Sequence, residues 1–283
     1  MEKKSEKAKV RKPELVFYAG STLLEGPHWE AQNNLIYCVS IEDNMIYAID
    51  PETGEVVTYL TEGPVGCAVL DQKGMILEAE KSGIFRIDPR TKEKQLVAKA
   101  HDDERIRYND GKLDPKGRLL VGTMGYDDTY EGKAALYAIE KDGTVRTVLD
   151  GLTLANGMGW SPDGKTLYFI DTPTKKVGSY AYDPETGEAI FEKYVIEITD
   201  GSNPDGMCVD MEGMIWVAPY GGEKVCRWDP ESGGKVEEIR RPGKKVTSCC
   251  LGGIKLEDIF ITNAKEGETQ KEIAGGLFRV KLS

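Results

Sequence analysis

A repeat of 40 to 49 residues is the feature that most limits how this chain can fold. A glycine opens each of five units, at intervals of 40, 45, 46 and 49 residues: Gly26, Gly66, Gly111, Gly157 and Gly206. A degenerate sixth opening is predicted near Cys249, 43 residues further on. Units of this length with about four strands each are typical of β-propeller blades. Six blades of about 45 residues need roughly 270 residues, close to the 283 of the chain.

Short apolar runs within the units predict strands rather than helices. Each run has four or five residues, is rich in β-branched or aromatic side chains, and is bounded by Gly, Pro, Asn or Asp, as in 35–39, 45–49, 119–123, 136–139 and 166–170. An Asp-Pro turn recurs at 50–54, 88–92, 183–187 and 229–233. Glycine makes up 32 of the 283 residues, above the usual ~7%, which fits a fold with many tight turns.

The expected fold is therefore all-β: one six-bladed β-propeller over residues 14–283, built from four-stranded antiparallel blades and preceded by a charged tail of residues 1–13. The C-terminal segment 276–282 supplies only a third strand to the last blade. Segment 14–18 would supply its outer strand, which closes the ring and removes an exposed edge. A two-domain β protein is the competing interpretation, and the regular spacing disfavours it.

Charge and composition exclude several classes of protein. The chain has 37 Lys and Arg against 48 Asp and Glu, a net charge of −11, which argues against binding a nucleic-acid backbone. Residues 1–14 lack the apolar region of a secretory signal, and no apolar run approaches the ~18 residues of a membrane span. The six cysteines form no C-x-x-C pair and are interpreted as buried side chains in a reducing compartment. We expect a cytoplasmic monomer or weak dimer without a nucleic-acid or membrane partner.

Oxygen-bearing side chains stand directly before four of the five glycine openings, at Glu25, Asp110, Asn156 and Asp205. The strand that opens a blade lies innermost, so these side chains are expected to converge at one mouth of the central channel. Arg107 and Asn109, two residues apart on an extended segment, would face the same side. Asn-Gly and Asp-Gly are ordinary turn dipeptides, but their recurrence in register with the blades favours a shared site.

The residue types indicate the chemistry of such a site. Carboxylate and amide oxygens suit Ca²⁺, Mg²⁺ or Mn²⁺, and Zn²⁺ is compatible if water completes its shell. With only His28 and His101 in the chain, a three-histidine zinc site is impossible. A Ser-His-Asp triad is formally open, but no G-x-S-x-G motif supports it. No glycine-rich nucleotide-binding motif occurs either.

An ordered set of motifs resembles the senescence marker protein/regucalcin/gluconolactonase family: 24–29 (LEGPHW), 107–112 (RYNDGK), 122–124 (GTM), 155–161 (ANGMGWS) and 204–207 (PDGM). Each motif alone is weak, whereas the set at these spacings is specific, and it extends from about Leu15 to Leu282. The resemblance implies a six-bladed propeller with one catalytic divalent cation (Ca²⁺, Zn²⁺, Mn²⁺ or Mg²⁺) and a sugar lactone as the small-molecule substrate.

Position by position, the resemblance implies that Glu25, Asn156 and Asp205 are the protein ligands of the metal. It implies that Arg107 and Asn109 contact the substrate, with Asn109 close to the metal.

The acidic sugar contact of the family would fall on Asp127, where the match is loose and Asp128 is the alternative. The surrounding stretch 124–132 would then be either a lid over the site or a solvated hairpin loop.

The implied reaction is hydrolysis of a cyclic ester, as in a gluconolactonase. The cation would polarise the lactone carbonyl, and metal-activated water would attack it. Asp205 and Asn109 are the catalytic candidates: Asp205 as general base, and Asn109 holding the substrate together with Arg107. Three alternatives stay open: a phosphotriesterase-like metal hydrolase, a non-catalytic calcium-binding propeller or scaffold, and a strictosidine-synthase-like propeller.

Overall fold

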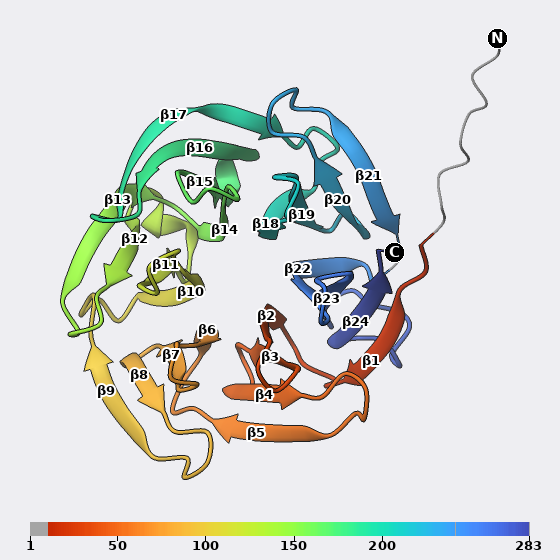
Figure 1. The fold of residues 1–283 in the computed structure, drawn as a ribbon, viewed down its shortest axis with the longest axis horizontal. Helices are drawn as coiled ribbons and strands as arrows, with labels where there is room; N and C mark the ends of the chain where they lie inside the picture. The colour runs from red at the N-terminus through yellow and green to blue at the C-terminus, as the bar shows by residue number, and fades with distance from the viewer. Residues whose placement is uncertain (1–10, 241, 283) are drawn as a thin grey trace.

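Six four-stranded antiparallel sheets are arranged as a ring around a central axis in the computed structural model, which describes residues 11–240 and 242–282 (Figure 1). Blade 1 consists of β2 (Leu24–Glu30), β3 (Leu35–Ser40), β4 (Met45–Ile49) and β5 (Val56–Leu60). Blade 2 consists of β6 (Val65–Leu70), β7 (Ile76–Glu80), β8 (Gly83–Ile87) and β9 (Lys94–Ala98). Blade 3 consists of β10 (Ile106–Leu113), β11 (Leu119–Gly125), β12 (Ala134–Ile139) and β13 (Val145–Leu152), with the short 3₁₀ helix η1 (Asp128–Tyr130) after β11.

The second half of the chain repeats this order. Blade 4 consists of β14 (Ala155–Trp160), β15 (Thr166–Asp171), β16 (Lys176–Asp183) and β17 (Glu188–Glu197), with η2 (Thr172–Thr174) after β15. Blade 5 consists of β18 (Asn203–Val209), β19 (Ile215–Tyr220), β20 (Lys224–Trp228) and β21 (Lys235–Arg240). Blade 6 consists of β22 (Lys245–Gly252), β23 (Asp258–Ala264), β24 (Gly276–Lys281) and, from the other end of the chain, β1 (Glu14–Tyr18).

The predicted ring closure is confirmed. β1 pairs antiparallel with β24 as the outermost strand of blade 6, so the two ends of the chain complete one sheet (Figure 1). The all-β, six-bladed architecture with four strands per blade is likewise as predicted. The predicted division into a tail of residues 1–13 and a single domain over 14–283 stays a prediction, and most of the tail lies outside the described residues.

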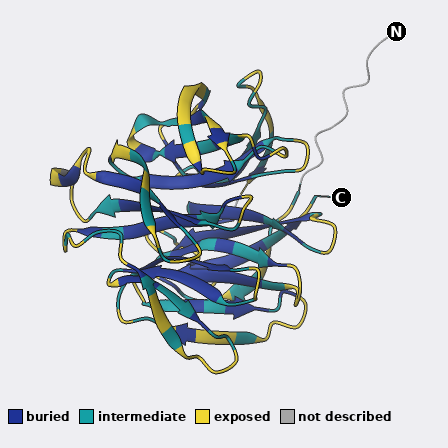
Figure 2. Ribbon diagram, turned by 60° about the vertical axis from the view of Figure 1, so that its left-hand side comes forward, coloured by how far each residue is buried: buried dark blue, intermediate teal, exposed yellow. Residues whose placement is uncertain are grey.

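The innermost strands of neighbouring blades pack against each other around the channel. Gly157 shows why glycine is needed here, since a Cβ at this position would lie 2.5 Å from the backbone oxygen of Asp205 on the next blade. The glycine surplus therefore serves close approach of backbones as well as turns. Burial decreases from the interior of the molecule to its outside (Figure 2). Every residue of the inner strand β6 is buried, whereas most of the outer strand β17 is exposed.

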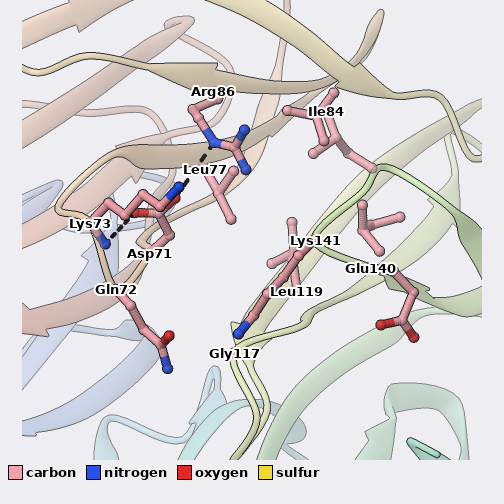
Figure 3. Close-up of a pocket in the computed structure, with 12 residues that line it drawn as sticks. Asp71, Gln72, Lys73, Leu77, Ile84, Arg86, Gly117, Leu119, Glu140 and Lys141 are labelled. Atoms are coloured by element: carbon pink, nitrogen blue, oxygen red, sulfur yellow. Dashed lines mark hydrogen bonds and ion pairs between the residues drawn. The ribbon is translucent and has the colours of Figure 1, made fainter.

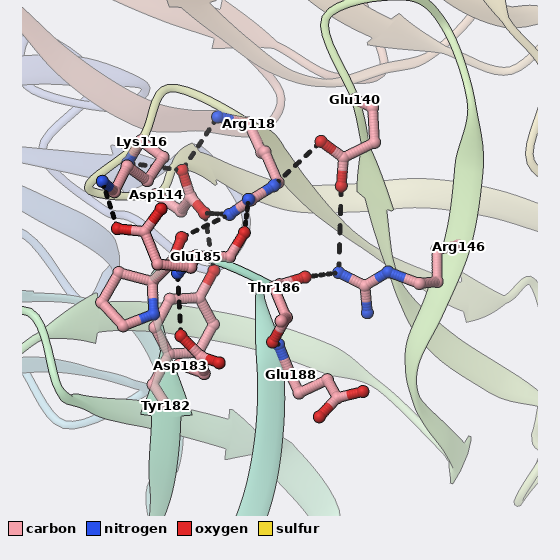
Figure 4. Close-up of polar contacts among 11 residues, drawn as sticks. Asp114, Lys116, Arg118, Glu140, Arg146, Tyr182, Asp183, Glu185, Thr186 and Glu188 are labelled. Carbon is pink, nitrogen blue, oxygen red and sulfur yellow. Dashed lines mark hydrogen bonds and ion pairs between the residues drawn. The ribbon is translucent and has the colours of Figure 1, made fainter.

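Apolar side chains fill the spaces between blades. A polar network also joins the β10–β11 turn of blade 3 to the β16–β17 turn of blade 4 (Figure 4). The Arg118 guanidinium of blade 3 lies 2.7 Å from Asp114 Oδ2 and donates to the carbonyl oxygen of Pro184 in blade 4, at 2.9 Å. Tyr182 of blade 4 donates its hydroxyl to the same Asp114 oxygen at 2.7 Å. These contacts fix the two blades relative to each other through a fully buried carboxylate.

All six cysteines are buried and carry free thiols, as the sequence predicts. In the part of the chain that the structure describes, no helix has the length and apolar character needed to cross a membrane.

Candidate metal and substrate site

At the level of the channel mouth, each innermost strand contains one more residue than the strand with which it pairs. The register shifts lie between Glu25 and His28 in β2, between Val65 and Cys67 in β6 and at the equivalent positions of β10, β14, β18 and β22. Such β-bulges bend a strand and redirect its side chains. The bulges begin at or directly after the candidate residues Glu25, Asn109, Asn156 and Asp205.

The bulges correct two details of the predicted register. The bulge of β10 places Asn109, rather than Asp110, at the position that Asn156 and Asp205 occupy in their blades. Asp110 therefore occupies the position that Gly157 and Gly206 occupy in blades 4 and 5. In the sixth opening the position equivalent to Gly206 is Ser248, one residue before the predicted Cys249. Both differences arise because the extra residue of a bulge depends on strand pairing, which the spacing of glycines does not reveal.

A pocket of about 260 Å³ lies at this mouth and collects the five principal candidates, Glu25, Arg107, Asn109, Asn156 and Asp205. They come from blades 1, 3, 4 and 5, so the structure brings together residues up to 180 positions apart in sequence (205 − 25 = 180). Four apolar side chains also line the pocket, those of Leu23, Ile41, Met124 and Leu154. The pocket thus combines polar and apolar lining residues, as small-molecule sites do.

Two of the candidate ligands keep a buried oxygen free. Glu25 is 7% exposed, and its Oε2 accepts the amide of Gly26, while its Oε1 has no hydrogen-bond partner among the described residues. Asn156 is 4% exposed and donates its Nδ2 to Thr172 Oγ1 at 3.1 Å, which leaves its Oδ1 without a partner among the same residues. Buried oxygens without partners are costly unless something satisfies them. A divalent cation with a preference for oxygen ligands would satisfy both.

The electrostatics of the pocket also fit a cation. Burial raises the pKa of Glu25 well above its usual value, and the negative charges of Asp205 and Asp110 raise it further. Burial raises the pKa of Asp205 in the same way, with Asp110 adding to the effect and the Asn156 amide and the Arg107 charge opposing it. Carboxylates held this close together repel each other unless a positive charge lies between them. Two carboxylates and one amide therefore suit a divalent cation.

The proposed donor set contains an amide as well as carboxylates. Across residues 11–240 and 242–282, no three His, Cys, Asp or Glu side chains meet in a metal-binding arrangement. The proposed ligand set has two carboxylates, Glu25 and Asp205, and its third member is the amide of Asn156.

Arg107 and Asn109 are connected to each other. Arg107 Nη1 donates to Asn109 Oδ1 at 2.8 Å and to the carbonyl oxygen of Tyr108 at 2.9 Å. Asn109 in turn donates its Nδ2 to the carbonyl oxygen of Ala155 at 3.0 Å. Burial lowers the pKa of Arg107, but an arginine side chain keeps its charge in proteins. Asn109 therefore holds a cationic donor in the wall of the pocket and connects it to blade 4.

Asp127, the predicted sugar contact, is not among the residues that line the pocket. It is exposed, and its Oδ1 accepts the backbone amide of Thr129 at 2.9 Å and the Thr129 hydroxyl. The side chain of Asp128, the alternative, lies outside the described residues. A role for Asp127 in binding the sugar, and a lid formed by residues 124–132, stay predictions.

Sequence reasoning missed four pocket or channel residues. Thr172, Asn203 and Tyr220 line the pocket, and they stand outside the repeated motifs that identified the other residues. Lys112 lies next to the site in β10 and donates its Nζ to the carbonyl oxygens of Met158, at 3.1 Å, and Met207. Lys112 belongs to the RYNDGK motif, so its position was visible in the sequence while its contacts were not.

A second hollow of about 240 Å³ lies between blades 2 and 3 (Figure 3). Its floor is aliphatic, including Leu77 and Leu119, and its charged rim includes Arg86, which lies 3.5 Å from Asp71. None of the candidate site residues lines it. The convergence of unpartnered oxygens distinguishes the channel-mouth pocket from this hollow.

Comparison with known proteins shows which sequences and structures this chain is similar to. A sequence model described as the SMP-30/Gluconolactonase/LRE-like region matches residues 23–265. Regucalcin of Danio rerio is 34% identical over 267 residues, covering 93% of this chain and 90% of that protein. A Bacillus subtilis (strain 168) protein provisionally named sugar lactone lactonase YvrE is 34% identical over 266 residues, covering 91% of this chain and 90% of that protein.

The crystal structure of a calcium-binding protein, regucalcin, from Agrobacterium tumefaciens is similar along almost the whole chain. It aligns with a TM-score of 0.87 and 25% identity, covering 97% of this chain and 95% of that one. The matched region 23–265 exceeds half of the chain and contains every candidate ligand. The chain therefore belongs to the SMP-30/gluconolactonase/LRE-like family.

Proposed function

We propose that this protein hydrolyses sugar lactones at the channel-mouth pocket, with one divalent cation held by Glu25, Asn156 and Asp205. The observation that supports it most is the pair of buried oxygens without partners among the described residues, Glu25 Oε1 and Asn156 Oδ1, in the same pocket as the Asp205 carboxylate. The family includes gluconolactonases by its description. A lactone needs an electrophile for its carbonyl oxygen and a base for water, and this pocket offers residues for both.

The cation, when bound, supplies a Lewis acid that polarises the lactone carbonyl. Asp205 is partly buried beside the other ligands, and we assign it the role of general base that takes a proton from the attacking water. Arg107 donates hydrogen bonds to the carbonyl or to ring hydroxyls, and Asn109 holds the guanidinium in place. The apolar lining residues Leu23, Ile41, Met124 and Leu154 are available to contact the carbon face of a sugar ring and to limit the access of bulk water.

The test is a panel of sugar lactones offered to metal-stripped protein, with Ca²⁺, Mn²⁺, Zn²⁺, Mg²⁺ and Fe²⁺ added back singly. We expect no hydrolysis above background without a cation and restored hydrolysis with at least one. The panel includes a phosphotriester, because a related metal hydrolase would act on it. Absence of lactone hydrolysis with every cation would contradict the proposal.

Calcium binding without catalysis is the second candidate. The supporting observation is that the similar Agrobacterium structure is described as a calcium-binding protein. Calorimetry with Ca²⁺ on the same metal-stripped protein separates the two functions. Tight Ca²⁺ binding without hydrolysis of any lactone would favour this candidate.

A further inference from the structure

The segment 171–175, which includes η2, lies between β15 and β16 of blade 4. It forms hydrogen bonds with the residues just before β14, at the start of blade 4, and just before β18, at the start of blade 5. Asp171 Oδ1 accepts the backbone amide of Leu154 at 2.9 Å, and the amide of Thr172 donates to the carbonyl oxygen of Leu154 at 3.1 Å. At the other end, Lys175 Nζ donates to the carbonyl oxygen of Ser202 at 3.1 Å. The backbone position of Thr172 is therefore fixed by contacts that do not involve any of the proposed ligands.

The Thr172 hydroxyl, which is buried, makes two hydrogen bonds in the wall of the pocket. It donates to the carbonyl oxygen of Pro204 at 2.8 Å and accepts from Asn156 Nδ2 at 3.1 Å. A carbonyl oxygen only accepts, and a hydroxyl has a single proton. Once that proton points to Pro204, the hydroxyl offers Asn156 only lone pairs. The amide of Asn156 must then present its NH₂ group to Thr172 and its oxygen to the pocket.

Thr172 thereby connects two of the proposed ligands. Its hydroxyl sets the orientation of Asn156 on β14. The same hydroxyl bonds to Pro204 on β18, which is the residue directly before Asp205. Without the hydroxyl, the amide of Asn156 could rotate by half a turn and present its NH₂ group, a donor, where a cation needs an oxygen. Groups that orient metal ligands in this way commonly change metal affinity by about 10- to 100-fold when they are removed.

We propose that Thr172 is a positioning residue of the cation site, which fixes the side-chain amide of Asn156 so that its Oδ1 faces the cation. The inference rests on the proposed function, because it assumes that Glu25, Asn156 and Asp205 hold a cation.

The test is isothermal titration of metal-stripped protein with Ca²⁺ and, separately, Mn²⁺. Thr172→Val keeps the shape of the side chain and removes the hydroxyl, and we expect its Kd for the cation to be at least about 10-fold higher than that of the wild type. Thr172→Ser keeps the hydroxyl and should bind within about threefold of the wild type. Thr174→Val is the matched control, because Thr174 donates its hydroxyl to the carbonyl oxygen of Asp171 at 2.7 Å within the same segment but lies outside the pocket lining.

The outcomes separate the two proposals. A wild type that binds neither Ca²⁺ nor Mn²⁺ is titrated with the other three cations of the lactone panel, and binding of none of the five would contradict the proposed function itself. A wild type that binds, together with Thr172→Val of equal affinity, would overturn only the role of Thr172. Equal losses in Thr172→Val and Thr174→Val would also overturn it, because the segment would then act through its general stability. Thermal melting of each variant identifies loss of fold, and Thr172→Ala provides a second measurement if the valine variant does not fold.

Discussion

The side chains at the channel mouth converge because each innermost strand carries one extra residue. The sequence alone predicts Glu25, Asn156 and Asp205, since each precedes a glycine at the repeat spacing. It does not separate Asn109 from Asp110, because both stand before Gly111 and only strand pairing shows which of them is equivalent to Asn156. Thr172 was beyond prediction for another reason: its role depends on a contact with a blade that begins 31 residues later in the chain (203 − 172 = 31).

Replacing Asp205 tests the general base. Asp205→Asn keeps the size of the side chain and one oxygen ligand but removes the proton acceptor. We expect lactone hydrolysis to fall by about 10²- to 10⁴-fold, the usual contribution of a general base, and the cation affinity to fall as well because a charged ligand is lost. Steady-state kinetics and titration calorimetry measure the two effects.

Asp127→Asn is the companion variant, chosen because Asp127 is exposed and outside the pocket lining. We expect its kcat/KM to stay within about threefold of the wild type, since exposed substitutions are usually close to neutral. A loss in Asp127→Asn as large as that in Asp205→Asn would instead support the sugar contact predicted from the resemblance. Wild-type turnover in Asp205→Asn would remove Asp205 from the mechanism.

Glu78 on β7 is a second residue whose environment gives a measurable consequence. Its side chain is fully buried, and its Oε1 lies 2.6 Å from Lys94 Nζ, which also contacts Glu80 at 2.8 Å. Burial raises the pKa of Glu78 to about 7 against the opposing effect of Lys94. The folded state therefore holds this proton more tightly than the unfolded state does. As the pH rises from about 4.5 to 7, the free energy of unfolding falls, because the unfolded chain releases the proton first.

Glu78→Gln removes this titration. Relative to the wild type, the variant should gain up to about 3 kcal/mol in the free energy of unfolding between pH 5 and pH 8, the value of a shift of this size. Urea denaturation at pH 5, 6, 7 and 8 gives the difference. Glu104→Gln serves as the control, because the Glu104 side chain is 82% exposed and substitutions at exposed positions usually change stability little. If the difference in the free energy of unfolding between Glu78→Gln and the wild type does not change with pH, the raised pKa of Glu78 is contradicted.

At the scale of the strands, the alternation of short apolar runs and turns was sufficient to predict the blades. The prediction worked because each strand is short, bounded by turn residues and buried on the faces between blades. The contacts that join one blade to the next were not predictable. Asp114, Arg118 and Tyr182 meet across 68 residues of sequence (182 − 114 = 68), and nothing in their local sequence indicates a partner so far away.

The network between blades 3 and 4 should be important for stability (Figure 4). Arg118→Met keeps much of the side-chain volume but leaves the Asp114 carboxylate buried without its cation. Removal of one partner from a buried ion pair usually costs about 3–5 kcal/mol, and we expect a loss of about 3 kcal/mol here because the Arg118 side chain is still 11% exposed. Chemical denaturation measures the change in the free energy of unfolding.

Arg90→Met is the matched control for that network. Arg90 pairs with Asp88 at 3.2 Å, but its side chain is 84% exposed, and exposed ion pairs contribute little to stability. The two variants carry the same change of residue and charge, so their comparison isolates burial. Similar denaturation midpoints for both would contradict the importance of the network.

At the scale of the whole molecule, closure of the ring was predictable because the last repeat lacks one strand and segment 14–18 supplies it. Which side chain enters the interior of the channel was not predictable, since the sequence contains no sign of it. Lys112 takes that position: it starts on β10 of blade 3, and its Nζ contacts carbonyl oxygens of Met158 in blade 4 and Met207 in blade 5. Its charge also offsets that of the buried Asp110 carboxylate, lowering a pKa that burial raises.

Lys112→Met tests whether this single ammonium group holds three blades together. Methionine fills similar space but leaves both carbonyl oxygens without the Lys112 donor and removes the positive charge that offsets Asp110. Each unsatisfied buried polar group costs about 1–3 kcal/mol, so the free energy of unfolding should fall by about 3 kcal/mol or more. Lys73→Met, at an exposed lysine, makes the same change in net charge and should leave stability close to that of the wild type. If both variants unfold at the same denaturant concentration, the Lys112 ammonium group does not hold the three blades together, and Lys112 acts only as a neighbouring charge for the cation site.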